Sequence, residues 1–362
     1  MKKILCYIDS MQMGGAQRVM ANLTKHFVDS NVSVILVNDI VPIDGVPEYE
    51  IDNKVKRIFL DQEKKKATGL RKNIYRIFAI RKLVKKEAPD VVLSFIGPPN
   101  IRMLLGTFGL RTRKIVSVRN DPYKEYGSGK KKAFAKCVFN LADGCVFQTN
   151  DAAKYFSGKL QKKSTVIFNP VKDSFYRVER KPDESTIIMV GRLNRQKNYH
   201  MAIEGFSIIS EQYPNICLKI YGEGELRQDI QGEINEMALS HRVELMGRTN
   251  DVEKKLSTAM LYLLTSDYEG MPNALMEAMA AGVPVVATNC PCGGPRELIH
   301  SKNEGILIRV NDSKELADKL RELIENRELR LKLGENAKKR ANEFLPEHIM
   351  KQWDNYLFDY QA

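Results

Sequence analysis

LYLLTSDYEGMPNALME, at residues 261–277, contains the parts of a strand–loop–helix unit. The first five residues, LYLLT at 261–265, are almost all apolar, which is typical of a strand in a parallel sheet covered on both faces. From Pro272 the pattern predicts a helix, because a proline near the first helical position has no backbone N–H to leave unbonded. The stretch therefore predicts one unit of an α/β fold.

The start of this helix predicts an anion site. The free N–H groups and the positive dipole end of a helix N-terminus attract negative charge, which suits a diphosphate. Glu277 lies just over one turn into the helix, where its carboxylate can accept both hydroxyls of a ribose. Glu269 precedes the helix and would face the group beyond the phosphates. Taken in isolation, two such glutamates favour solvated side chains on a capped helix, so the surrounding motifs decide.

Similar apolar runs alternate with helical patterns along the whole chain. The alternation starts again after residue 185, which predicts two doubly wound α/β domains. We expect a first domain over 1–170, a polar linker over 171–184, a second domain over 185–342 and a closing helix over 343–362. The predicted strands lie at 3–8, 32–37, 90–96, 114–118 and 144–148, and then at 186–191, 216–222, 243–247, 261–265 and 284–288.

The composition is that of a globular protein with unevenly distributed charge. Of the 362 residues, 43% are hydrophobic and 28% charged, and no apolar run reaches the roughly 20 residues of a membrane-spanning helix. The first 181 residues carry 35 Lys and Arg against 17 Asp and Glu, whereas the remainder carries 22 against 28. A basic first half favours a nucleic acid, an anionic bilayer or a diphosphate-bearing substrate as partner. Six cysteines without tight spacing indicate a reducing cytoplasm.

Cations and glycines follow several predicted strands. Arg192 and Lys197 come after the first strand of the second half, where a guanidinium fork and an ammonium group could clamp phosphate. Glycines at the carboxyl ends of parallel strands let the backbone approach a ligand closely. They are Gly14 and Gly15 in the first half, and Gly191, Gly222 and Gly224 in the second.

Together these motifs closely resemble family 4 of the retaining glycosyltransferases, which have the GT-B fold of two Rossmann-like domains facing a cleft. The resemblance implies transfer of a hexose or N-acetylhexosamine from a nucleotide-sugar, with a UDP-sugar favoured, to a glycan acceptor. It is closest to enzymes of bacterial capsule and lipid-linked oligosaccharide synthesis. It runs over almost the whole chain: GGAQR at 14–18, NP at 169–170, GRL with the following lysine at 191–197, GEG at 222–224, EGMPNALME at 269–277 and CPCGGPREL at 290–298.

The resemblance also implies roles for individual residues. The residues matching Arg192 and Lys197 neutralise the donor diphosphate and stabilise the leaving group. The residue matching Glu277 holds the ribose, and the one matching Glu269 contacts hydroxyls of the donor sugar. The candidate catalytic residues are Arg119, Arg192, Lys197 and Glu269, and the candidate substrate-binding residues are Gly14, Gly15, Asn169, Gly191, Gly222, Gly224, Gly270, Met271, Pro272, Asn273, Ala274 and Glu277.

Two features limit what carries over from the family. Many relatives have a histidine in the loop after the strand matching 114–118, but this chain has Arg119, which cannot act as a base at neutral pH. It could stabilise negative charge or bind an anionic acceptor. No Asp-x-Asp triplet occurs, so we expect transfer without a metal or any other cofactor. The implied mechanism is front-face attack, in which the leaving phosphate takes the acceptor proton.

The basic excess is concentrated in residues 54–86, which hold 13 Lys and Arg against Asp61 and Glu63. Within them, RKNIYRIFAIRKLVKK at 71–86 predicts an amphipathic basic helix. Such a helix packs on its own sheet, which is the preferred interpretation, or touches anionic lipid and guides a polyprenyl-diphosphate acceptor. The second alternative predicts a cytoplasmic protein that lies peripherally on the inner face of the cell membrane and acts on an envelope glycan.

Other classes of protein would explain fewer of these sequence features. A nucleic-acid binder would fit the charge, but no DNA or RNA motif is present. A nucleotide-sugar epimerase or phosphorylase of the same fold would lack the EGMPNALME arrangement, and a non-catalytic partner subunit would not need the intact cations and glutamates. Within the preferred class, a GDP-sugar donor and a soluble acceptor stay open as alternatives.

Overall fold

The computed structural model describes residues 1–12, 14–61 and 69–358 and divides the chain into two compact units. The first unit is Met1–Asn169 together with the segment from Ile349, and the second is Pro170–His348. Met13, residues 62–68 of the basic segment and residues 359–362 of the predicted closing helix lie outside the described residues. No helix in the described ranges combines the length and apolarity needed to cross a membrane.

The first unit is built on a seven-stranded parallel sheet in the order β3-β2-β1-β4-β5-β6-β7. The central strand β1 pairs with β2 and β4, and Ile4 lies opposite Val34 and Val91. The chain thus turns back across β1, which makes the sheet doubly wound. The strands are β1 (Lys3–Ile8), β2 (Ser33–Asn38), β3 (Lys56–Phe59), β4 (Val91–Phe95), β5 (Arg113–Ser117), β6 (Gly144–Phe147) and β7 (Ser164–Val166).

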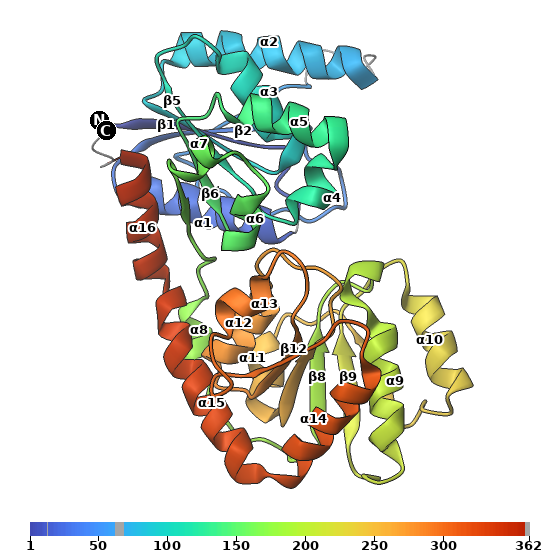
Figure 1. The fold of residues 1–362 in the computed structure, drawn as a ribbon. Coiled ribbons are helices and arrows are strands. Elements are labelled where there is room, and N and C mark those ends of the chain that lie inside the picture. The colour runs from blue at the N-terminus through green and yellow to red at the C-terminus, as the bar shows by residue number, and fades with distance from the viewer. Residues whose placement is uncertain (13, 62–68, 359–362) are drawn as a thin grey trace. The chain divides into compact units, whose positions relative to one another are not determined.

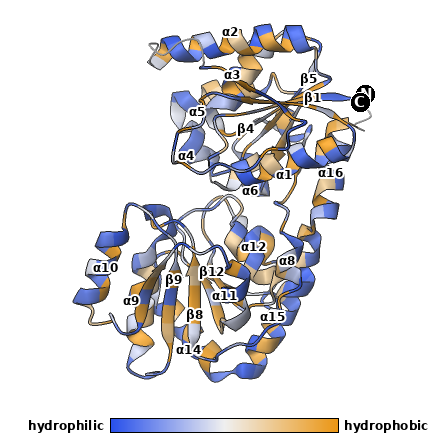
Figure 2. Ribbon diagram, turned by 180° about the vertical axis from the view of Figure 1, so that it is seen from behind, coloured by the Kyte–Doolittle hydropathy of each residue, from blue (hydrophilic) through white to orange (hydrophobic). Residues whose placement is uncertain are grey.

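Helices cover both faces of this sheet (Figure 1). Helix α1 packs on β1 and β2, while α3 packs on β1, β4 and β5 and carries α2 on its outer side. Because both faces are covered, the central strands are mainly apolar, as the hydropathy colours of Figure 2 show. The helices are α1 (Gly15–Asp29), α2 (Gly69–Glu87), α3 (Gly97–Thr107), α4 (Pro122–Tyr126), α5 (Gly129–Phe139), α6 (Asn150–Lys154) and α7 (Gly158–Gln161).

The C-terminal helix α16 (Pro346–Phe358) contributes to the core of the first unit from Ile349 onward. Trp353 is fully buried, with its ring centroid 5.8 Å from that of Phe95. Phe358 makes an edge contact with Phe27 of α1 at the same centroid distance. Tyr356 donates a hydrogen bond of 2.5 Å to the carbonyl oxygen of Lys163. These aromatic side chains therefore pack in the fold.

The second unit has a six-stranded parallel sheet in the order β10-β9-β8-β11-β12-β13. Its central strand β8 is flanked by β9 and β11, so this sheet is doubly wound as well. The two sheets confirm the predicted class of two doubly wound α/β domains. The strands are β8 (Thr186–Val190), β9 (Cys217–Tyr221), β10 (Val243–Gly247), β11 (Leu261–Leu264), β12 (Val285–Thr288) and β13 (Ile306–Ile308).

Helices also cover the sheet of the second unit. α9 packs on α14, and α12 packs on α15 and on α8. Residues 171–184, predicted as a linker, lie inside this unit, where the N–H of Lys181 donates to the carbonyl of Ser257. The helices are α8 (Asp173–Tyr176), the 3-10 turn η1 (Arg195–Lys197), α9 (Tyr199–Ser210), α10 (Arg227–Glu236), α11 (Val252–Thr258), α12 (Asn273–Ala280), α13 (Gly294–Leu298), α14 (Ser313–Glu325), α15 (Arg327–Ala341) and the 3-10 turn η2 (Asn342–Phe344).

Candidate functional site

Two loops at the carboxyl ends of the adjacent strands β8 and β11 are bonded to each other. Asn198 has a left-handed backbone (φ 45°), and its side chain donates to Asp267 at 2.7 Å while accepting from the N–H of Met201 in α9. Thr265 donates to the carbonyl oxygens of Lys197 and Asn198 at 3.0 and 2.9 Å. The N–H of Asp267 donates back to Gln196. Each loop therefore fixes the other.

This arrangement brings Lys197 and Glu269 into contact. The Lys197 ammonium donates to Oε1 of Glu269 at 2.6 Å, and the Ser266 hydroxyl donates to the same oxygen at 2.8 Å. Both charged side chains are largely buried, with 17% and 8% of their surfaces exposed. Because water screens a largely buried pair less than a surface pair, the two charges attract each other more strongly here than they would on the surface.

Arg192, the other predicted phosphate ligand, lies on the same β8 loop but is exposed. No described residue makes an ion pair or a side-chain hydrogen bond with its guanidinium. The site thus holds one cation that is neutralised by a carboxylate and one that is open to solvent.

Helix α12 starts directly after the Glu269 loop. Its cap residue is Pro272, so the proline stands one position before the helix, and Asn273 and Ala274 form the first turn. Helix N–H groups in a first turn have no partner within the helix and can bind an anion. Gly270 and Met271, which precede this turn, are buried.

Glu277 lies in the second turn of α12 and is 6% exposed. The nearby Tyr262 hydroxyl of β11 is buried without a hydrogen-bond partner among the described residues. Burial raises the pKa of Tyr262 well above its usual value, and the charges of Glu277 and Glu269 raise it further. A neutral phenol is therefore close enough to both glutamates to feel their charges. Neither this tyrosine nor Ser266 was predicted, because an apolar strand pattern does not distinguish a tyrosine in a site from one in the core.

The predicted glycines of the second unit have an additional packing role. A side chain on Gly222 would clash with the carbonyl oxygen of Gly191, and one on Gly224 would clash with that of Leu193. A Cβ on Gly191 would lie 3.1 Å from Cε of Lys197. Close packing of the β8 and β9 loops thus requires Gly222 and Gly224, while Gly191 has only a tight side-chain neighbour. Contact of the three glycines with a ligand stays a prediction.

In the first unit, Gly14 and Gly15 lie at the start of α1, after β1. Gly14 is the cap residue and has an extended backbone, with φ −170° and ψ 163°. Because glycine has no side chain, Gly14 forms no side-chain hydrogen bond to the N–H groups in the first turn of α1. The 15-residue helix α1 therefore begins, after the carboxyl end of β1, with backbone N–H groups that no cap side chain binds.

The structure brings Arg119 and Asn169 together in the first unit. The Arg119 guanidinium donates to Oδ1 of Asn169, and its carbon lies 4.9 Å from the centroid of the Phe95 ring. Gln148 lies within hydrogen-bond distance of the same Asn169 oxygen, at 2.9 Å. Burial lowers the pKa of Arg119, although a guanidinium stays protonated at neutral pH. Arg119 is thus a buried cation at the carboxyl end of β5.

Glu125 of α4 lies near this cation and was not predicted. Burial raises the pKa of its carboxyl to about 7, while the N–H of Gly97 and the charge of Arg119 act in the opposite direction. Its Oε2 is buried without a partner among the described residues. A single acid in a lysine-rich segment gives no signal in the sequence, since only the fold places it beside Gly97 and Arg119.

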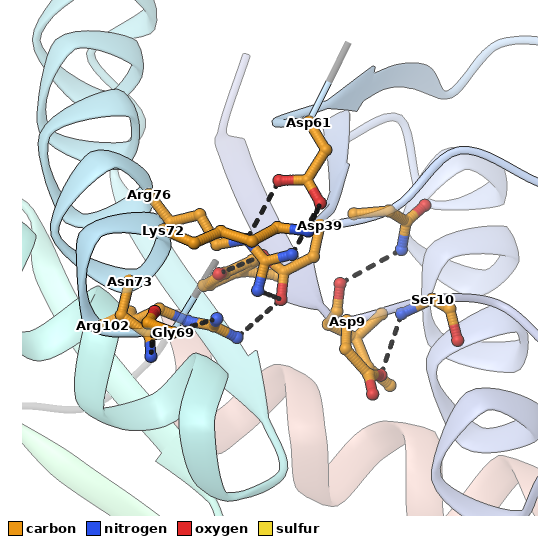
Figure 3. A network of polar contacts seen from close by, with 12 residues as sticks. Asp9, Ser10, Asp39, Asp61, Gly69, Lys72, Asn73, Arg76 and Arg102 are labelled. Atoms are coloured by element: carbon orange, nitrogen blue, oxygen red, sulfur yellow. Dashed lines mark hydrogen bonds and ion pairs between the residues drawn. The ribbon is translucent and has the colours of Figure 1, made fainter. Parts of the chain in front are cut away.

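A second polar network lies at the carboxyl ends of β2 and β3 (Figure 3). Asp39 accepts hydrogen bonds from Arg102 of α3 and from Tyr7, both at 2.6 Å. Arg76 of α2 forms two hydrogen bonds with Asp61, at 3.1 and 2.6 Å, and Lys72 pairs with Asp61 at 2.9 Å. Two cations of the predicted basic helix therefore pair with carboxylates of the first unit itself, and 33% of the Lys72 side chain and 11% of the Arg76 side chain stay exposed.

Comparisons with known proteins identify glycosyltransferases as relatives of this chain. Residues 171–340 match the family described as glycosyl transferases group 1, and residues 13–175 match glycosyltransferase family 4. The chain is 25% identical, over 98% of its length and 97% of the relative's, to a Campylobacter jejuni alpha-1,4-N-acetyl-D-galactosaminyltransferase whose named substrate is a GalNAc glycan on diphospho-undecaprenol. It is 24% identical, over 99% and 100% of the two lengths, to an amylovoran biosynthesis glycosyltransferase of Erwinia amylovora.

A solved structure of similar fold is that of HepE from Anabaena, in complex with UDP and glucose. The TM-score is 0.79 at 19% identity, with 98% of this chain and 99% of HepE covered. At that identity the likeness establishes the fold alone.

Proposed function

The chain belongs to glycosyltransferase family 4, and we propose that it transfers a hexose or an N-acetylhexosamine from a UDP-sugar to a glycan carried on a polyprenyl diphosphate, with retention at the anomeric carbon. The observation that carries this proposal is the pair of Lys197 and Glu269 beside the N-terminus of α12. An ammonium group and a helix N-terminus at one place suit the diphosphate of a nucleotide-sugar.

In this proposal, different residues of the second unit bind different parts of the donor. Arg192 and Lys197 stabilise the negative charge that develops on the leaving diphosphate, and the first turn of α12 adds backbone N–H groups. Glu269, held by Ser266 and Lys197, faces the sugar, while Glu277 accepts the ribose hydroxyls. In the free enzyme Glu269 neutralises Lys197, and an arriving diphosphate shares that cation.

The chemical step needs no base from the protein in this proposal. The acceptor hydroxyl attacks on the face from which the diphosphate leaves, its oxygen bonds to the anomeric carbon, and its proton passes to the leaving phosphate oxygen. Arg119 cannot serve as a base, and its guanidinium is bound to Asn169. Retention and transfer without a metal both follow from this scheme, and the lack of an Asp-x-Asp triplet supports the second.

Transfer should therefore be seen with purified protein, a polyprenyl-diphosphate-linked glycan and a donor chosen by thermal shift from UDP- and GDP-sugars. A bound donor raises the melting temperature, because it stabilises the folded protein by RT ln(1 + [L]/Kd). We expect full activity in excess EDTA and a product with the donor's anomeric configuration by NMR. Loss of activity in EDTA with rescue by Mg²⁺ or Mn²⁺ would contradict the metal-free scheme, and an inverted product would contradict retention.

The lipid-linked acceptor is supported by α2. Leu70, Ile74 and Phe78 recur every four residues on this helix and are 76%, 45% and 65% exposed. Lys82, Lys85 and Lys86 are exposed in its last turns. An apolar stripe with flanking lysines is typical of a helix lying in the interface of an anionic bilayer. We infer that α2 holds the protein peripherally on the inner face of the cytoplasmic membrane.

Replacing Lys82, Lys85 and Lys86 together by Glu should weaken binding to phosphatidylglycerol vesicles by roughly tenfold or more, because each cation near such a surface contributes about 1 kcal/mol. Cosedimentation at moderate salt measures the change. A matched control replaces the exposed Lys159 and Lys162 of the same unit and should bind normally. If the variant with three replaced lysines binds the vesicles as well as the control variant does, α2 only packs on its own sheet.

A further inference from the structure

A cavity of about 590 Å³ opens between α2, α3, α4 and α5 of the first unit. Its walls are mainly apolar and include Ile77 of α2, Ile101 and Leu105 of α3, and Phe134 of α5. Leu70, which begins the exposed stripe of α2, also lines it. The volume lies in the range of roughly 300–1,000 Å³ that is usual for ligand sites. We call this cavity the α2–α5 groove.

The groove contains buried polar atoms that lack partners. Arg102 lines it and is 4% exposed, with its terminal nitrogens bonded to Asp39 and Asn73 (Figure 3). Its Nε has no hydrogen-bond partner among the described residues. Glu125 lines the groove as well, and its Oε2 is also buried and unbonded within the described chain. These two atoms are polar points in a lining that is otherwise mainly apolar.

The rim of the groove is basic. Lys130 and Lys131 line it from the first turn of α5, an 11-residue helix with no acid in that turn. Both lysines are exposed. Cations at a helix N-terminus are repelled by the helix dipole, so an anion bound at this rim would relieve an unfavourable arrangement. The groove therefore combines an apolar interior with a positively charged mouth.

We propose that the α2–α5 groove binds the first isoprene units of the polyprenyl chain of the acceptor, with the phosphate of that lipid against Lys130 and Lys131. The occupant follows from charge complementarity: an apolar chain with an anionic head matches an apolar groove with a basic rim. This inference rests on the proposed function and adds to it a subsite for the lipid. The remainder of the chain leaves the groove along the exposed stripe of α2.

Two substitutions test the groove. Leu105→Trp fills its half-buried wall, and Phe134→Asp places a charge at its mouth, where the native side chain is 54% exposed. Each should weaken the binding of a radiolabelled long-chain polyprenyl phosphate in detergent about tenfold or more, which is the usual effect of small changes in an apolar pocket. Phe108→Asp is the matched control, because Phe108 is 63% exposed and lies outside the groove. It should bind the lipid normally.

A kinetic comparison separates this inference from the proposed function. With acceptors that carry the same glycan on a long polyprenyl or a short, water-soluble chain, both groove variants should raise KM for the long chain only and leave kcat unchanged. If the wild-type protein uses neither acceptor, the proposed function fails. If it uses both and Phe134→Asp behaves as Phe108→Asp does, the groove inference alone fails. If the groove variants lose affinity for polyprenyl phosphate and for phosphatidylglycerol vesicles equally, the occupant is bulk phospholipid and the groove inference is wrong.

Discussion

Lys197→Ala is expected to lower turnover by roughly 10²–10³, because a preorganised charge at the leaving group acts mainly in the transition state. The lysine contacts Glu269 at 2.6 Å, and removing it leaves that carboxylate buried without its cation. A bound diphosphate would then meet an uncompensated negative charge. The nucleotide affinity should therefore fall along with kcat. Steady-state kinetics with saturating acceptor measure both quantities.

Arg195→Ala is the matched control for this variant. Arg195 lies in the same 3-10 turn and is exposed, but it does not contact Glu269. It should keep near-normal activity. Arg192→Ala should lose turnover as Lys197→Ala does, while its melting temperature stays close to that of the wild type because its side chain is exposed. Near-normal turnover in both Arg192→Ala and Lys197→Ala would remove the phosphate clamp from the mechanism.

The two glutamates should lose activity in different ways. In the proposed mechanism Glu269 faces the sugar, where positive charge develops as the glycosidic bond opens, so Glu269→Ala should lower kcat by about 10² or more with a smaller change in KM. We propose that Glu277 binds the ribose, an interaction that is equally strong in the ground and transition states. Its replacement by Ala should therefore raise the donor KM and leave kcat much less affected.

Isothermal titration with the nucleoside diphosphate separates these roles, since that ligand has no sugar. Glu277→Ala should bind it more weakly. Glu269→Ala should bind it normally or more tightly, because Lys197 loses the carboxylate that neutralises it. The opposite result, with affinity lost in Glu269→Ala and kept in Glu277→Ala, would mean that the donor lies in the reverse orientation.

The central strands of both sheets could be predicted from the sequence because they are buried on both faces. Burial on two faces requires a continuous apolar run, as in β1, β8 and β11. Three edge strands, β3, β7 and β13, were not predicted. They have three or four residues each and carry partly exposed side chains, as in KRIF at Lys56–Phe59. An edge strand forms because its backbone pairs with one neighbouring strand, and this pairing does not require an apolar sequence pattern.

The sequence by itself determined the family and predicted the residues that we propose for the donor site, because motifs of glycine, cation and carboxylate follow the strands that hold them. The tertiary structure alone decided which of those residues touch. Lys197 and Glu269 are 72 positions apart and meet only because β8 and β11 are neighbours in the sheet. Likewise, Lys72 and Arg76 turn toward Asp61, and the α2–α5 groove forms where four separate helices meet. Such contacts depend on long-range packing, which local periodicity does not encode.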